Sequence, residues 1–339
     1  MRIMGVGIDL AKQVFQIHGV DERGRPVLKK RLQRSKVREF FAQLEPCVVG
    51  MEACGSAPFW ARELSQLGHE VKLMAAPFVR PYRKKDKNDG NDAAAICEAV
   101  ARPTMRFVAV KTPEQQAVLT LHRARELVVA ERTALANQTR GLLGEFGLVV
   151  NQGIAQVRRA LPAILEDAEN GLPGVARETF AELYERLVDL DRRVQHSDRR
   201  LTALAQEMEP ARRLMQVEGV GVLTATALIA TVGDASMFNN GRQFAAWVGL
   251  VPRQFSTGGK PRLGRITKHG DVYLRTLLVH GARGVLRHLG EPSDAKGQWV
   301  QRVKAHRGYN NAAVALAAKN ARILWALLAR GARYQPATV

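Results

Sequence analysis

The N-terminal part of the chain alternates between short apolar runs and longer amphipathic stretches. Runs rich in β-branched residues and bounded by turn residues are typical of strands, whereas apolar positions three or four apart are typical of helices. These patterns predict an antiparallel meander of three strands, followed by helices that alternate with further strands. The predicted strands span 3–9, 14–20, 26–32, 47–52 and 70–75, and the predicted helices 35–44, 57–68 and 91–102.

The middle of the chain carries apolar residues at heptad spacing, with turn residues between two long amphipathic segments. This pattern predicts an antiparallel helical hairpin. Heptad spacing alone does not separate an intramolecular arm, a dimer interface and an ordinary bundle core. The two apolar series are Leu121, Val128, Leu135 and Leu142, and Leu183, Leu187, Leu190, Val194, Ser197, Leu201 and Leu204.

The last third of the chain is basic, punctuated by glycine and mainly helical in pattern. It opens with "VEGVGVLTATALIATVG", a Gly-Val-Gly turn before an apolar helix, which is helix-hairpin-helix-like. Small residues in such a turn let backbone amides approach phosphate. The whole chain thus predicts an α/β plus α protein with a mixed-sheet domain at 1–110, a helical coiled-coil arm at 111–209 and a helical domain at 210–339.

The net charge of +19 indicates the kind of partner that the protein binds. So large an excess of positive charge favours a polyanion, and it favours nucleic acid over a membrane surface. The excess is concentrated between Arg242 and Arg333, where seventeen Lys or Arg stand against three acids, a net of +14. We therefore expect the main nucleic-acid surface in this segment.

The three cysteines and the N-terminus narrow the cellular setting. Cys47, Cys54 and Cys97 lie in apolar sequence without paired spacing, which indicates reduced thiols and neither a zinc site nor a disulfide framework. The N-terminus runs directly into a strand pattern, and no uninterrupted apolar run has the length of a membrane span. We expect a cytoplasmic protein with no membrane partner.

Two acids, Asp89 and Asp92, stand three apart in "KKDKNDGNDAAAICEAVA" where an alanine-rich helix is predicted to begin. Taken alone, the pair fits a helix N-cap. Asp9 ends the first predicted strand and Glu52 the fourth, and a charge at the end of an apolar strand is costly unless it is paired or binds metal. If the first and fourth strands are adjacent, all four carboxylates meet at one edge of the sheet.

Four convergent carboxylates require a cation, and an oxygen-only site selects Mg²⁺ or Mn²⁺. Two such ions clamp the attacking and leaving oxygens of a phosphodiester. The neighbouring basic residues Arg80, Arg83, Lys84 and Lys85 are expected to face phosphate. A rival interpretation of "GIDLAK" is the phosphate loop of actin-like ATPases, but the glycine that approaches ATP is missing.

A glycine-rich loop in the basic segment, "RQFSTGGK", contains Ser256. A serine hydroxyl is a poor nucleophile without a base or metal, and the loop holds no acid, so any activation must come from elsewhere. A Ser-Thr-Gly-Gly sequence is by itself more often a turn. Nearby, Lys268, His269 and Asp271 form a polar cluster in which a phosphate-contacting or structural role is favoured over a proton relay.

Six ordered motifs together carry a resemblance that covers essentially the whole chain: "GIDLAK", "MEACGS", "KNDGNDA", "GVLTATALIATVGD", "FAAWVGLVPRQFSTGGKPRLG" and "NNAAVALAAKNARILWALL". The chain resembles DEDD insertion-sequence transposases of the one-ten family, eleven-eleven subgroup, which are related to Piv-type DNA invertases. The resemblance implies a RuvC-like (RNase H-type) domain, a coiled-coil middle and a C-terminal transposase domain. It also implies DNA recombination directed by a bridge RNA, through a covalent serine–DNA link in a dimer of dimers.

Residue by residue, the resemblance implies that Asp9, Glu52, Asp89 and Asp92 are catalytic metal ligands and that Ser256 is the nucleophile, with Thr257 a second hydroxyl beside it. The heptad seam at 183–204 is the candidate dimer interface, and a site composed from two protomers is expected. The residues expected to bind nucleic acid are Arg80, Arg83, Lys84, Lys85, Arg253, Lys260, Arg262, Arg265, Lys268, Lys319 and Arg322.

Two other functions remain open from the sequence. A metal-dependent nuclease of the Holliday-junction type would hydrolyse DNA with the acids alone. A non-catalytic protein would bind nucleic acid through its net charge and counterion release. The presence of all four acids argues against a decayed catalytic domain.

Overall fold

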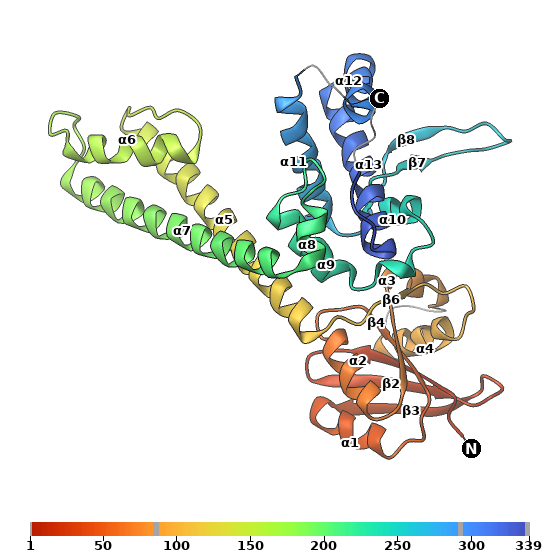
Figure 1. The fold of residues 1–339 in the computed structure, drawn as a ribbon. Helices are drawn as coiled ribbons and strands as arrows, with labels where there is room; N and C mark the ends of the chain where they lie inside the picture. The colour runs from red at the N-terminus through yellow and green to blue at the C-terminus, as the bar shows by residue number, and fades with distance from the viewer. Residues whose placement is uncertain (1, 84–87, 291–293, 336–339) are drawn as a thin grey trace. The chain divides into compact units, whose positions relative to one another are not determined.

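The computed structural model describes residues 2–83, 88–290 and 294–335 (Figure 1). The chain forms two compact units, Met1–Thr112 and Pro113–Val339. The boundary predicted near residue 110 lies beside this division, whereas the helical arm and the C-terminal helices belong to one unit. The three-part division at 110 and 209 therefore stays a prediction.

The first unit is built on a six-stranded mixed sheet with the order β3-β2-β1-β4-β5-β6. The first three strands form the predicted antiparallel meander, and β4 runs parallel to β1 as its neighbour. This confirms the predicted mixed α/β class. A short β6, which the sequence did not predict, pairs with β5. The strands are β1 (Gly5–Leu10), β2 (Val14–Val20), β3 (Pro26–Gln33), β4 (Val48–Glu52), β5 (Glu70–Met74) and β6 (Phe107–Val108).

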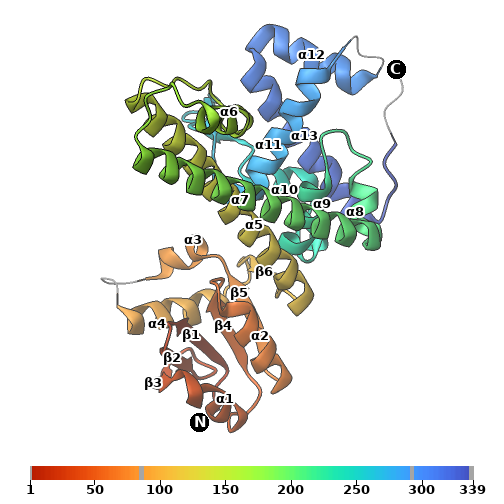
Figure 2. The same ribbon diagram turned by 90° about the vertical axis from the view of Figure 1, so that its left-hand side faces the viewer.

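Helices cover both faces of this sheet, and Figure 2 shows α2 and α4 on opposite sides of the strands. Val6 and Ile8 of β1 point to the face covered by α1 and α2, where they pack in a core with Phe41 and Leu64. The other face carries α4, and its own smaller core includes Ile96. The helical elements are η1 (Arg34–Lys36), α1 (Val37–Ala42), α2 (Ala57–Gln66), α3 (Ala76–Val79), η2 (Arg80–Tyr82) and α4 (Asp89–Val100).

Two strand glycines let α4 lie directly on the sheet. A Cβ on Gly7 would fall 2.8 Å from Cys97 Cβ and closer still to the Ala93 carbonyl oxygen and the Cys97 nitrogen. A Cβ on Gly50 would fall 2.8 Å from Val100 Cβ. The backbone approach between α4 and these strands therefore excludes every residue except glycine at position 7.

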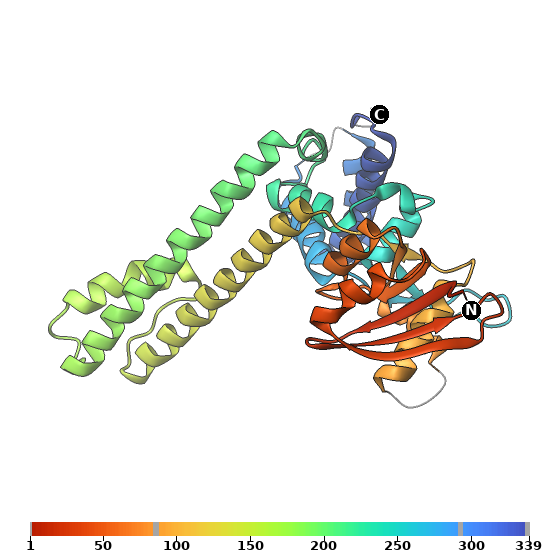
Figure 3. The ribbon, with the colours of Figure 1, turned by 90° about the horizontal axis from the view of Figure 1, so that it is seen from below.

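The second unit begins with a long antiparallel helical hairpin, confirming the predicted hairpin. Figure 3 shows its two helices side by side, α5 in yellow and α7 in green. The shorter α6 packs against both of them near the far end of the hairpin. The helices are α5 (Pro113–Glu145), α6 (Ile154–Glu166) and α7 (Gly174–Glu207).

The heptad seam is the interface between α5 and α7 of one chain. Leu187 and Leu201 of α7 are fully buried, and Leu135 of α5 lies in the same core as Leu187. The prediction that this seam forms a dimer interface is therefore wrong for these positions, because their apolar surface is already covered within the chain. A buried ion cluster joins all three helices, since Asp191 accepts from Arg132 at 2.9 Å and also from Arg158.

In the described part of the second unit that follows the arm, six helices and their connections pack around one apolar core. The apolar α13 is long enough to cross a membrane by length and composition alone, but Leu316 and Leu324 are fully buried and half of the window is inside the protein. This is weak evidence for a membrane span and fits a core helix. The elements are α8 (Glu209–Leu214), α9 (Val222–Val232), η3 (Ala235–Met237), α10 (Gly241–Val248), β7 (Pro252–Gln254), β8 (Leu263–Ile266), α11 (Val272–His288), α12 (Ala295–Arg307) and α13 (Tyr309–Arg330).

A buried polar network joins the arm to this core. His122 of α5 lies 2.9 Å from the Tyr273 hydroxyl through Nδ1 and 2.9 Å from Thr226 Oγ1 through Nε2. Thr226 donates its own proton to the Val222 carbonyl, so its oxygen must accept from Nε2–H. Nδ1 then accepts from Tyr273, and the imidazole is neutral. Burial, reinforced by the Arg125 charge, lowers the pKa of His122 to about 4.

The network predicts that acid destabilises the second unit. The folded pKa of about 4 lies below the ordinary 6.5, so the stabilisation is complete above about pH 6.5 and is lost as the pH falls towards about 4. The loss approaches about 3 kcal/mol. Urea unfolding of the full chain across this range measures it. His122→Gln should flatten this part of the profile, whereas the exposed His196→Gln should leave it unchanged.

The packing of α4 predicts that Gly7→Ala destabilises the first unit by about 1–3 kcal/mol, because the helix must move off the strand. Hydrogen exchange of β1 and α4 peptides measures the loss. Gly5→Ala is the matched control, since its Cβ would meet only Val20 Cγ2 at 3.7 Å. Equal exchange in the two variants would show that the close approach of α4 to Gly7 does not limit stability.

Candidate functional site

The first predicted acids, Asp9 and Glu52, lie side by side at one end of the sheet. Ile8 pairs with Met51 across the parallel β1–β4 ladder, so Asp9 and Glu52 occupy the next register position. Side chains alternate along a strand, so Asp9 shares the face of Gly7 and Glu52 shares the face of Gly50. That face is covered by α4. The structure thus brings these two carboxylates to the same edge and the same face, as predicted.

The direction of α4 places its first turn at that same edge. Ala93 lies over Gly7, and one turn later Cys97 Sγ donates to the Gly5 carbonyl oxygen at 3.6 Å, so α4 runs antiparallel to β1. Asp89 and Asp92 stand in its first turn. Neither is the N-cap, because the Asn88 side chain accepts from the Asn91 amide at 2.8 Å.

The two helix acids have different surroundings. Asp92 is mostly buried, and its Oδ1 lies 3.2 Å from Arg83 Nη1, whereas Asp89 is exposed. Across the described residues, no three His, Cys, Asp or Glu side chains are grouped closely enough to hold one metal ion. The structure therefore brings the acids to one edge of the sheet, but their side chains do not form one metal-binding cluster. Their oxygen-only chemistry fits Mg²⁺ or Mn²⁺.

The basic residues beside the acids are only partly available. Arg80 is exposed, but Arg83 is engaged by Asp92, so its predicted phosphate-facing role is replaced here by an ion pair. Lys84 and Lys85 lie outside the described residues. Among the described residues of this predicted group, Arg80 is therefore the exposed cation that can contact phosphate.

Ser256 lies on a two-stranded ribbon that the sequence did not predict. Strands β7 and β8 pair antiparallel and project from the helical core (Figure 1). The turn from Thr257 to Lys260 has Gly258 at a φ of 56° and Gly259 at a φ of 75°. Two successive positive φ values define a type I′ hairpin turn, which explains the Gly-Gly pair. The loop is therefore an ordered hairpin whose tip and serine are exposed.

The Ser256 hydroxyl has one polar neighbour on the ribbon. Gln254 Nε2 donates to Ser256 Oγ at 2.8 Å, which holds the side chain on one face of the strand. Sequence analysis missed Gln254, although its position two residues before the serine on a strand is the signal for a shared face. The ribbon contains no acid, so it supplies no general base of its own.

The predicted cations around Ser256 are all exposed. Arg253 donates to the Thr267 carbonyl at 3.3 Å, which ties it to the base of the ribbon. Lys260, Arg262 and Arg265 lie along the ribbon. Their shared exposure gives the hairpin a continuous positive charge next to the serine hydroxyl.

The cluster after the ribbon is mainly structural. Lys268 adopts a left-handed φ of 56°, and its amide donates to the Gly249 carbonyl at 3.2 Å. The His269 backbone packs against Gly249, and Asp271 caps α11 by accepting from the Leu274 amide at 2.8 Å. Lys268 is exposed and remains a candidate for phosphate, whereas Asp271 is explained by its cap.

The other predicted contacts lie on α13. Arg322 is exposed, while Lys319 Nζ lies 4.5 Å from the centre of the Trp299 ring. Partial burial and the adjacent Arg322 charge lower the pKa of Lys319. Lys319 therefore makes a cation–π contact, and the exposed Arg322 is the better candidate of the two for binding phosphate.

The helix-hairpin-helix-like turn serves packing. A Cβ on Gly219 would fall 2.8 Å from the Gly281 carbonyl oxygen, and the backbone of Gly219 leaves equally little room for a Cβ on Gly281. These two glycines let the turn lie directly on α11. Sequence analysis predicted that this turn approaches phosphate, but at Gly219 the turn contacts α11 instead. The following Gly221 has free space around it.

Two family models match the chain. A DEDD transposase model of the IS110 type matches residues 6–147, and the model described as Transposase IS116/IS110/IS902 family matches residues 211–298. The chain is 52% identical over 337 residues to a probable family 20 transposase of Pseudomonas aeruginosa, which covers 99% of this chain and 100% of that protein.

Further relatives also align along nearly the full chain. The transposase for insertion sequence element IS1111A of Coxiella burnetii is 43% identical over 330 residues, covering 97% of this chain and 91% of the relative. The transposase for insertion sequence element IS1328 of Yersinia enterocolitica is 41% identical over 326 residues, covering 96% of this chain and 97% of the relative.

The matched regions contain the residues on which the site depends. The four acids fall within the first matched region, and the ribbon with Ser256 falls within the second. A DEDD transposase architecture implies the use of divalent metal. The chain belongs to the IS110/IS116/IS902 family of transposases, enzymes that cleave and rejoin DNA.

Proposed function

We propose that this transposase cuts and rejoins DNA through a phosphoserine intermediate formed by Ser256, with the acids of the first unit binding Mg²⁺ or Mn²⁺ and a bridge RNA directing the site. The observation that carries the proposal is the pair Asp9 and Glu52 on one face and one edge, with the first turn of α4 directed to them. The exposed, cation-flanked serine supplies the second reactive group.

The residues present fit a divalent cation, which Asp9 and Glu52 would hold together with Asp92 or Asp89. When bound, such an ion polarises the scissile phosphate and stabilises the developing negative charge. Asp92 must then exchange its ion pair with Arg83. The released Arg83 guanidinium is a donor suited to a phosphate oxygen.

The serine step conserves the phosphodiester. Ser256 Oγ attacks phosphorus, the new O–P bond forms, and the bond from phosphorus to the 3′ oxygen breaks. The hydroxyl proton leaves to a base outside the ribbon, and the 3′ oxygen takes up a proton to become a free hydroxyl. That hydroxyl attacks the phosphorus of the next phosphoserine, the P–Oγ bond breaks, and the serine oxygen regains a proton, so strand exchange requires no ATP. Gln254 orients the Ser256 Oγ, and the cations of the ribbon position the sugar-phosphate backbone of the DNA.

The partners follow from the charge and the topology of the reaction. DNA donor and target and the RNA all present phosphates to the basic second unit, and we place the enzyme in the bacterial cytosol. Two duplexes must be held together, so we propose a homo-oligomer, a dimer or a dimer of dimers. Because the ribbon has no acid, the site is composed from the acids of one protomer and the serine of another.

A hydrolytic nuclease is the second candidate, because the acidic edge lies wholly within the first unit and needs no serine to activate water.

Covalent trapping distinguishes the transposase with a serine nucleophile from the hydrolytic nuclease. Wild-type protein with element DNA, RNA and Mg²⁺ should yield a protein–DNA adduct that resists denaturation, and Ser256→Ala should reduce it below detection. Thr257→Ala is the matched control and should retain the adduct. An adduct from Ser256→Ala would reassign the nucleophile, and cutting by Ser256→Ala that Asp9→Ala abolishes would favour hydrolysis.

The composite site makes a separate prediction. Asp9→Ala and Ser256→Ala proteins should each be inactive alone, and mixed oligomers should regain part of the activity, because each variant retains the group that the other lacks. Strand exchange by the mixture, after co-assembly is verified by mass, is the measurement. Complete inactivity of verified mixed oligomers would mean that each site is built within one chain. If wild-type protein shows no exchange with cognate RNA, DNA and metal, the non-catalytic binding function is favoured.

A further inference from the structure

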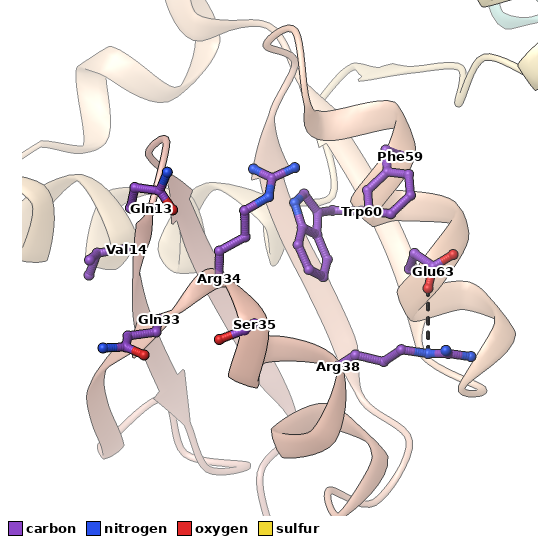
Figure 4. A pocket seen from close by; sticks show the side chains of 9 residues that line it. All are labelled: Gln13, Val14, Gln33, Arg34, Ser35, Arg38, Phe59, Trp60 and Glu63. Carbon is purple, nitrogen blue, oxygen red and sulfur yellow. Dashed lines mark ion pairs between the residues drawn. The ribbon is translucent and has the colours of Figure 1, made fainter.

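A hollow of about 740 Å³ lies in the first unit, on the face of the sheet opposite the acids (Figure 4). It is formed where β1 turns into β2, where β3 ends in η1, and by the first turns of α2. Gln13, Arg34 and Trp60 line it from these three places. The hollow is at the same end of the sheet as Asp9, because β1 and β3 end there and β2 begins there.

The indole of Trp60 carries a hydrogen-bond donor with no acceptor. Trp60 is 5% exposed, and its Nε1 is buried without a hydrogen-bond partner among the described residues. An indole N–H can only donate, and burying it unpaired costs about 1–3 kcal/mol. The atom itself is covered, so in this arrangement the indole contributes its ring to the wall of the hollow and does not present its N–H to a ligand.

The nearest charge is the guanidinium of Arg34, also a donor. Its Cζ lies 5.3 Å from the centre of the Trp60 ring and 5.8 Å from that of Phe15. Figure 4 shows the nitrogen side of the Trp60 ring next to this guanidinium. A guanidinium on the wall of a hollow is complementary to an anion.

The one carboxylate on the hollow is compensated. Glu63 pairs with Arg38 at 3.4 Å, at the rim away from Arg34 (Figure 4). No ion pair engages Arg34 among the residues that the structure describes, so its charge sets the sign of the hollow. Gln13 and Gln33 add exposed amide groups that suit a sugar or a base edge.

An exposed aromatic ring completes the lining. Phe59 is 43% exposed and packs edge-on against Trp60 with ring centres 5.3 Å apart. Exposed aromatic rings in a positively charged groove are the surfaces on which single-stranded nucleic acids stack their bases. A duplex does not offer a free base face, because its bases are stacked on one another.

We infer that this hollow binds one unpaired nucleotide of a nucleic acid strand. Its phosphate accepts from Arg34, and its base stacks on Phe59. The site is separate from the acids, since it lies on the face of α1 and α2 and theirs lies on the face of α4. Because both are at one end of the sheet, a strand held here is anchored next to the edge where the acids stand.

Binding by the full chain tests the inference, with labelled single-stranded RNA, single-stranded DNA and duplex DNA of one sequence compared by fluorescence anisotropy. Phe59→Ala and Arg34→Ala should each weaken single-strand binding about five- to tenfold and leave duplex binding unchanged. Arg34→Ala should also lower the slope of log affinity against log salt by about one.

Arg23→Ala is the matched control, because Arg23 is an exposed cation on the β2–β3 turn of the same unit. It should leave single-strand affinity unchanged. A loss with RNA alone or with DNA alone supports the site and identifies its strand, and equal losses with both support a site that does not distinguish them. Unchanged single-strand affinity in Phe59→Ala and Arg34→Ala, or an equal loss in Arg23→Ala, would overturn it. The readout needs no cleavage, so it does not depend on whether Ser256 is the nucleophile.

Discussion

The arrangement of the first unit depends on the absence of a side chain at Gly7. Because nothing separates β1 from α4 there, the helix backbone lies on the strand backbone, and the direction of the helix is set by the contacts of Ala93 and Cys97. This fixes the first turn of α4 at the carboxyl ends of β1 and β4. Asp9, Glu52 and Asp92 come from three distant parts of the sequence, and this one packing contact determines that they share an edge.

Two described features stabilise negative charge at that edge. The first turn of α4 carries the positive end of the helix dipole, which stabilises acids near it. Arg83 compensates Asp92 directly at 3.2 Å. Like charges on neighbouring strands repel unless a cation intervenes, so the edge is suited to exchange an internal cation for a metal ion. This ion pair holds Asp92 against Arg83, which is consistent with the lack of a group of three acids close enough for one ion among the described residues.

Much of this could be predicted from the sequence, because the relevant signals are short in range. Alternating apolar residues in 14–20 and a buried run ending at Glu52 are properties of single strands, and adjacency of the first and fourth strands follows from the meander. The acidic edge was therefore accessible. The sequence offered an N-cap as one explanation of the Asp89–Asp92 pair, whereas the structure uses Asn88, since Asn and Asp have similar capping propensity and only the backbone conformation separates them.

The remaining features depend on contacts that sequence patterns do not encode. The β7–β8 ribbon has no alternating apolar face, because it is covered on neither side, so only its Gly-Gly turn marked it. A heptad seam has the same spacing whether its partner is α5 or a second chain. Gly219 looked like a phosphate-binding turn because a glycine that approaches a helix and one that approaches phosphate satisfy the same steric condition.

The division of the chain has a mechanistic consequence. The acids lie in the unit that ends at Thr112, and the serine lies in the unit that begins at Pro113. In the second unit, His122 joins the arm to α9 and α11, and α11 follows the ribbon closely in sequence. The arm, the helical core and the ribbon base therefore share one packed body. The acids, in contrast, belong to the other compact unit, so a reaction that uses both the acids and the serine, as proposed, requires residues from both units.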